Sequence, residues 1–238
     1  MATKVCLNCS TPLEKGEKFC AACGQSAKTK RLSLRQVRKD LLKKFLHADA
    51  GILHLTREMA LRPGVVAREY VEGKRKKYYS PLSYLTLSAG ISVFLNEYFH
   101  LMERMPGQAN PGSEFAMRYF NLIILFSVPV SALFSWWLFR KKGYNYAENL
   151  AFHAFLGGFR TVFFVLIFTP LVLWARDYYY TVLIAYFGLW IAYLAWAKIQ
   201  FFGGPKWLTL LKTILILLFN QILVTLVIVA YVYWKRHS

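Results

Sequence analysis

The segment 208–234, LTLLKTILILLFNQILVTLVIVAYVYW, decides the fold class of this 238-residue chain. Such an apolar run suits a helix of about 20 residues or more that crosses about 30 Å of hydrocarbon. Four further segments share this character, at about 82–102, 119–139, 150–174 and 178–197. A soluble protein does not usually contain buried helices of this length five times over. The sequence therefore predicts an all-α membrane helix bundle of about five transmembrane helices over residues 81–238.

Composition changes near Pro81. Residues 1–80 carry 18 Lys and Arg against 7 Asp and Glu, a net charge of +11, whereas the remaining chain carries +7 among long apolar runs. Lys and Arg beside a membrane are attracted to anionic lipid, so the total of +18 does not by itself indicate a nucleic-acid partner. Two regions are therefore expected, one aqueous and one in lipid.

All four cysteines lie near the start of the chain, as Cys6, Cys9, Cys20 and Cys23. Two Cys-x-x-Cys pairs at this spacing are typical of a zinc ribbon, in which four thiolates close a tetrahedral shell around one structural Zn²⁺. A thioredoxin-type redox pair is the less favoured alternative, because that motif would not be duplicated. We expect residues 1–26 to form the ribbon in a reducing compartment.

Residues 27–80 are predicted to form a basic amphipathic helical connector. Leu34, Val37, Leu41 and Phe45 recur at helical spacing. Basic side chains flank this stripe, namely Arg35, Arg38, Lys39, Lys43 and Lys44. The helix suits the lipid surface, packing within the molecule or a partner.

A second basic group precedes the first apolar segment. It consists of Lys74, Arg75, Lys76 and Lys77, which two tyrosines follow. Basic residues followed by aromatic residues and then an apolar run are typical of a cytoplasmic membrane entry point. Upstream, the Arg62-Pro63-Gly64 break is expected to start a short helix that Gly73 ends.

The chain resembles an uncharacterised bacterial family of zinc-ribbon integral membrane proteins that carry a domain of unknown function. The N-terminal motifs of this likeness are Cys6-x-x-Cys9, Phe19-Cys20-Ala21-Ala22-Cys23-Gly24-Gln25, Leu55-Thr56, Arg62-Pro63-Gly64, Arg68-Glu69-Tyr70-Val71-x-Gly73-Lys74-Arg75-x-x-Tyr78 and Pro81. The later motifs are Pro129-Val-Ser-Ala-Leu, Arg140-Lys-Lys and Tyr146-Ala-Glu148-Asn149-Leu-Ala-Phe152-His153. Asn149 departs from the His that the family pattern implies. The resemblance supports the architecture and implies no activity.

The distribution of Lys and Arg predicts the orientation. A cytoplasmic N-terminus places most basic loop residues inside, namely Lys74–Lys77, Arg140–Lys142, Lys198 and Lys206. The reducing environment that the ribbon needs gives the same answer. Five spans place Lys235 and Arg236 outside, which is the one conflict. We expect a multi-pass protein of the bacterial inner (cytoplasmic) membrane.

Polar side chains inside the predicted spans form a candidate intramembrane cluster. Its members are Glu97, His153, Arg160, Asn220 and Gln221. Two interpretations compete: the cluster joins helices by hydrogen bonds, or it lines a path for a proton, an ion or a lipid headgroup.

Three functions fit this pattern. The favoured one is an adaptor or scaffold whose ribbon and basic helix engage a cytoplasmic protein or the lipid bilayer. The alternatives are a small transporter or channel, and a membrane-tethered ribbon that binds nucleic acid, which we do not expect. Catalytic activity is not expected either, because no nucleophile motif or catalytic metal-ligand spacing is present. Assembly into a homo-oligomer remains open.

Overall fold

The computed structural model describes residues 4–14, 16–38, 51–100 and 111–237, and these are helical except for the loops and the N-terminal four-cysteine segment, residues 4–14 and 16–26, which we call the ribbon. Residues 34–38 form one helical turn. The α-helices that follow are α2 (Gly51–Leu61), α3 (Pro63–Glu72), α4 (Pro81–Phe99), α5 (Pro111–Arg118), α6 (Phe120–Leu138), α7 (Tyr146–Phe163), α8 (Thr169–Trp174), α9 (Tyr179–Phe202) and α10 (Lys206–His237). A π-helical segment, Phe164–Phe168, joins α7 to α8, and short 3₁₀ turns, Arg140–Lys142 and Arg176–Tyr178, precede α7 and α9.

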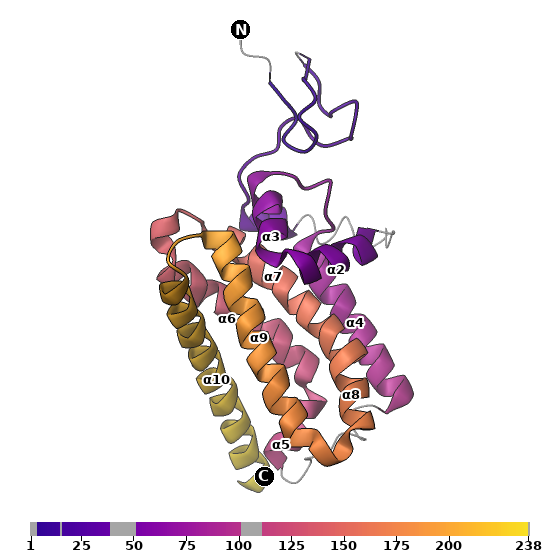
Figure 1. Cartoon of the computed structure of the whole chain (residues 1–238), viewed down its shortest axis with the longest axis vertical. Coiled ribbons are helices and arrows are strands. Elements are labelled where there is room, and N and C mark those ends of the chain that lie inside the picture. The colour runs from indigo at the N-terminus through magenta and orange to yellow at the C-terminus, as the bar shows by residue number, and fades with distance from the viewer. Residues whose placement is uncertain (1–3, 15, 39–50, 101–110, 238) are drawn as a thin grey trace.

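Four long apolar segments have the length and composition to cross a membrane. They are Asn121–Leu138, Tyr146–Trp174, Arg176–Phe202 and Lys206–His237. These overlap four of the predicted spans, 119–139, 150–174, 178–197 and 208–234. In Figure 1 the helices run side by side as a bundle, with the ribbon beyond one end. The prediction of a helical membrane protein is confirmed at this level.

Helix α4 covers the predicted span 82–102, whose last two residues lie outside the described part of the chain. It is not one of the four segments apolar enough for a crossing. Several serines interrupt its apolar sequence and are buried against the bundle, namely Ser83, Ser88 and Ser92. The helix nevertheless packs closely on α7, where a Cβ added at Gly158 would lie 2.5 Å from Tyr84.

Helices α2 and α3 lie across the ribbon end of the bundle (Figure 1). Pro63 starts α3, and Gly73 follows its last residue with a φ of 121°, as the sequence predicts. The Gly64 amide donates to Gln200 Oε1 at 2.9 Å, and a Cβ at Gly64 would lie 2.1 Å from a carbonyl oxygen of α9. In return Arg68 donates to the carbonyls of Gln200 and Phe201. Each helix therefore satisfies terminal groups of the other, which clamps α3 to α9.

The main hydrophobic core lies at the same end and joins the connector to the bundle. Tyr70 of α3 meets Phe155 of α7 edge-on, with ring centroids 5.3 Å apart. Phe152 stacks on Phe201 at 4.4 Å, and Leu32 of the linker is buried in the same cluster. The largest hydrophobic cluster of the described chain thus joins the linker and connector to the bundle.

Candidate metal centre, docking contacts and intramembrane cavity

The four cysteines converge on one point. Their sulfur atoms all lie within 4.8 Å of one another, and the Cys6–Cys23 and Cys9–Cys20 sulfurs are 3.6 Å apart. Disulfide bonds need about 2.05 Å, whereas four sulfurs about 2.3 Å from a central tetrahedral ion lie about 3.8 Å apart. The arrangement therefore fits one metal ion held by four thiolates.

Two similar backbone turns present these sulfurs. In the first, the Ser10 amide donates to the Cys6 carbonyl at 2.9 Å, and in the second the Gly24 amide donates to the Cys20 carbonyl at 2.8 Å. Both residues that follow a Cys-x-x-Cys pair have positive φ, 62° at Ser10 and 69° at Gly24. The Thr11 hydroxyl and a backbone hydrogen bond lower the pKa of Cys9 to about 6. A backbone hydrogen bond from Gln25 lowers the pKa of Cys23, but desolvation and the neighbouring Cys9 and Cys6 thiols outweigh it and raise the pKa to about 11, so Cys9 is the thiol that ionises first.

The ribbon has almost no hydrophobic core of its own. Its buried cluster contains Cys6, Leu13 and Cys20, with Cys23 and Ala27 packed beside them. A segment this small needs a metal or another domain to hold its shape.

The ribbon docks on the turn that follows α3. The Gln25 side-chain amide donates to the Gly73 carbonyl at 2.8 Å, and its oxygen accepts from the amides of Arg75 and Lys76, both at 3.1 Å. Leu7 covers Gly73 so closely that a Cβ there would lie 2.7 Å from a Leu7 methyl group. One glutamine thus makes three hydrogen bonds to a single turn of the connector.

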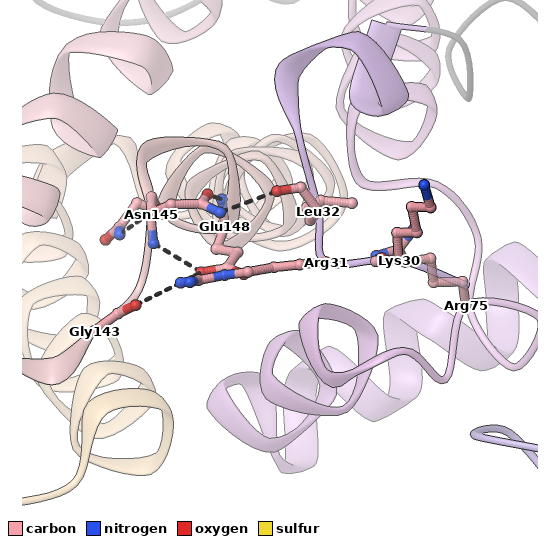
Figure 2. A network of polar contacts seen from close by, with 8 residues as sticks. Lys30, Arg31, Leu32, Arg75, Gly143, Asn145 and Glu148 are labelled. Carbon is pink, nitrogen blue, oxygen red and sulfur yellow. Dashed lines mark hydrogen bonds and ion pairs between the residues drawn. The ribbon is translucent and has the colours of Figure 1, made fainter. Parts of the chain in front are cut away.

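A second contact attaches the linker to the bundle (Figure 2). Arg31 binds both oxygens of Glu148, at 2.7 and 2.9 Å, and donates to the Gly143 carbonyl at 2.5 Å. Glu148 also forms a capping box with Asn145 at the start of α7, and Asn145 donates to the Leu32 carbonyl at 3.0 Å. Because Glu148 is only 3% exposed, this is a buried carboxylate paired with a partly exposed guanidinium.

The predicted basic surface groups have different environments. Arg35 and Arg38 are exposed, as expected, whereas Lys39, Lys43 and Lys44 lie outside the described residues. Lys74 and Lys77 both pair with Glu69, at 3.0 and 2.8 Å. Arg75 is buried and donates to the Lys30 carbonyl at 2.6 Å, so Lys76 and Lys77 are the exposed members of the second group.

A cavity of about 450 Å³ lies between α6, α7, α9 and α10. It brings together four of the predicted intramembrane residues: His153, Arg160, Asn220 and Gln221 all line it. Asn220 donates to the Ser131 hydroxyl at 2.6 Å, which links α10 to α6, and Gln221 lies 3.5 Å from Thr225 on its own helix.

Glu97 is not part of the cavity wall in the described chain. Arg160 instead donates to the Tyr186 hydroxyl at 3.2 Å and lies over the Trp190 ring, 5.6 Å from its centroid. Both partners belong to α9, whereas Glu97 lies near the end of α4. Glu97 and Arg160, which the predicted cluster places together, therefore make no described contact with each other.

Lys198 is a cavity residue that sequence reasoning misplaced. The predicted span 178–197 left it in a cytoplasmic loop, but α9 continues to Phe202 and buries Lys198 to 1% exposure. A single lysine beside a long apolar segment looks like a loop residue, because such segments usually end at the first charge. The aromatic pair Phe201 and Phe202 after it is the signal that the helix continues.

Gln25, Arg31 and Glu148 were not proposed as site residues either. Gln25 and Glu148 stand within the resemblance motifs, but their partners lie 48 or more positions away.

The apolar helices indicate a multi-pass membrane protein, and its N-terminal module carries a four-cysteine cluster whose geometry fits a metal ion. Residues 49–93, which cover α2, α3 and the first part of α4, match the model of a family described as protein of unknown function, DUF3667. The chain matches no curated protein and no solved structure.

Proposed function

We propose that this protein is a bacterial inner-membrane adaptor, whose zinc ribbon presents a binding surface to a cytoplasmic protein at a fixed position above the bundle. One observation carries the proposal: Gln25 attaches the ribbon to the connector and Arg31 attaches the adjoining linker to α7, while the Phe19 side chain beside the cysteine cluster is 63% exposed. Aromatic side chains, Phe included, are enriched at protein interfaces.

The metal in this proposal is Zn²⁺ with a structural role. Four thiolates at tetrahedral spacing suit zinc and leave no open coordination position for a substrate. When bound, the ion would supply folding energy to the ribbon, and no catalytic step is assigned to the protein. The orientation follows from charge: the ribbon end carries Arg140–Lys142 and the Lys74–Lys77 turn, which favours the cytoplasmic side. Helix α4 is the proposed fifth span.

In-cell photo-crosslinking tests the adaptor role. A photo-reactive phenylalanine analogue at position 19 should yield one defined protein adduct, and the Cys20→Ser substitution should abolish it, because metal loss unfolds the surface that presents the probe. The same analogue at Leu53, an exposed residue of α2, is the matched control. An equal adduct at both positions, or no adduct at position 19, contradicts recruitment by the ribbon.

The cavity supports transport as a second candidate function. His153, Arg160 and Lys198 place polar groups inside the bundle, which is the property that a pathway through a membrane needs. Ion flux through proteoliposomes that contain the full chain should then depend on Arg160. Absent flux, or equal flux in Arg160→Leu, rejects transport and leaves the adaptor role untouched.

A further inference from the structure

The intramembrane cavity is lined by basic side chains without acidic ones. His153, Arg160 and Lys198 face it together with the amides of Asn220 and Gln221, and its described wall contains no Asp or Glu. A buried ammonium or guanidinium is strongly unfavourable unless an anion or several acceptors meet it. The positive charge of this wall is therefore not balanced within the cavity.

Two of these groups are almost fully buried without a described partner. Lys198 is 1% exposed, and in the described chain no hydrogen bond or ion pair reaches it. His153 is 6% exposed, and its Nε2 has no hydrogen-bond partner. Lys198 lies four residues before the end of α9, about 6 Å inside the ribbon end, and His153 lies seven residues into α7, about 10 Å inside. These depths suit an anionic headgroup at the boundary of the hydrocarbon.

An apolar groove continues from the cavity. It has a volume of about 390 Å³, lies between α5, α6 and α10, and has walls such as Phe126 and Val227. Ser127 and Asn220 are among the residues that line both spaces, so the two are contiguous. A charged compartment that opens into an apolar groove matches a molecule with an anionic head and a hydrocarbon tail.

We infer that this joined space binds one phosphate-bearing lipid of net negative charge. Its phosphate would accept hydrogen bonds from Lys198 and His153, with Arg160 deeper in the same wall, and one hydrocarbon chain would lie between α6 and α10. Phosphate offers several acceptor oxygens to converging donors, and such charge-assisted hydrogen bonds are the strong ones. This binding site goes beyond the adaptor role and does not rest on it.

Native mass spectrometry of the purified full chain in neutral detergent tests the assignment. The probes are dioleoyl phosphatidylglycerol and dioleoyl phosphatidylcholine, which share their chains but differ in net charge, and sodium phosphate at millimolar concentration. We expect one equivalent of phosphatidylglycerol to bind more tightly than phosphatidylcholine. Lys198→Met should weaken that binding about tenfold or more, because it removes a desolvated charged hydrogen bond. Lys198→Arg should retain it.

The matched control is Lys206→Met, which removes an exposed lysine of α10 that lies outside the cavity wall. It should leave the affinity unchanged. Val227→Trp fills the apolar groove, so it should weaken lipid binding but not the binding of inorganic phosphate. If Lys198→Met does not fold, two measurements still test the inference: the effect of Val227→Trp on lipid affinity, and the difference in affinity between phosphatidylglycerol and phosphatidylcholine.

Three outcomes overturn the inference. Equal affinity for the two lipids shows that the basic wall does not select an anion. Equal effects of Lys198→Met and Lys206→Met show that Lys198 is not a ligand. If inorganic phosphate displaces phosphatidylglycerol, and Val227→Trp binds phosphatidylglycerol as tightly as the wild type does, the site binds free phosphate and the lipid is rejected.

Discussion

The contact between Arg31 and Glu148 makes a quantitative test of how the linker is attached. Substitution of Arg31 by Met removes a bidentate ion pair with contacts of 2.7 and 2.9 Å. Among the described residues it leaves the buried Glu148 carboxylate with the Asn145 amide as its one remaining hydrogen-bond donor. A fully buried pair broken in this way costs about 3–5 kcal/mol. Arg31 is 61% exposed, so solvent screens the pair and we expect about 1.5 kcal/mol, close to a charge-assisted hydrogen bond.

Hydrogen exchange followed by mass spectrometry measures that loss locally. Opening of residues 28–32 should become about tenfold more frequent in Arg31→Met, since 1.4 kcal/mol corresponds to a factor of ten. Arg35→Met is the matched control, because Arg35 is an exposed arginine of the neighbouring helical turn. A double-mutant cycle with Glu148→Gln isolates the pair, with an expected coupling of about 1–2 kcal/mol.

Equal hydrogen-exchange rates of residues 28–32 in Arg31→Met and Arg35→Met would refute the claim that Arg31 attaches the linker to α7. A coupling below about 0.3 kcal/mol would do the same, because additive effects within that error mean that the two side chains act independently.

Three other perturbations follow from the structure. Chelation, or Cys20→Ser, should unfold the ribbon and leave the helix content of the bundle unchanged; metal analysis and circular dichroism measure the two effects. A ribbon whose amides stay protected from hydrogen exchange after the metal is removed contradicts the proposed role of zinc. Partial burial raises the pKa of Glu69, but the hydrogen bonds from Lys77, Tyr78 and Lys74 outweigh it and lower the pKa to about 2. The resulting stability is complete above about pH 4.5 and disappears as the pH falls towards 2, so the difference in melting temperature between wild type and Glu69→Gln should shrink in that window; a constant difference argues against the ion pairs. Gly64→Ala should destabilise by about 1–3 kcal/mol in a detergent unfolding titration, since its Cβ clashes with α9, whereas Gly90→Ala, which meets nothing within 4 Å in α4, should be neutral or stabilising; equal effects would exclude the close helix contact.

Features with a strong local signal were predictable from the sequence. The four apolar spans follow from hydrophobic length, and the convergence of Cys6, Cys9, Cys20 and Cys23 follows from their spacing. The start of α3 at Pro63 is also local, because proline suits the first turn of a helix.

The attachment contacts had no comparable signal. Gln25 finds its partners 48 to 51 positions away, and Arg31 finds Glu148 at a separation of 117, so only the tertiary arrangement reveals them. The π-helical segment Phe164–Phe168 had no clear sequence signal either. Pro170, which follows it, is typical of a kinked helix but does not indicate that the preceding turn is wider than an α-helical one.

Predictions that rested on the charge of single residues differ from the structure in two places. Lys198 has the sequence setting of a loop lysine, yet an extra turn of α9 carries it into the bundle. Lys74 and Lys77 look like free surface charges, but both pair with Glu69, whose carboxylate offsets one of their two positive charges. Net charge therefore overstated the basic surface that the membrane entry presents.

The contacts of Gln25 in the ribbon and of Arg31 in the adjoining linker have a mechanical consequence. A module held at one point can turn in any direction, whereas one held at two separated points can turn only about the line that joins them. If the ribbon binds a partner as proposed, the range of orientations of that partner above the bilayer is therefore restricted, and a force on it would be transmitted through Arg31 to the Gly143 carbonyl and to Glu148 in the first turn of α7.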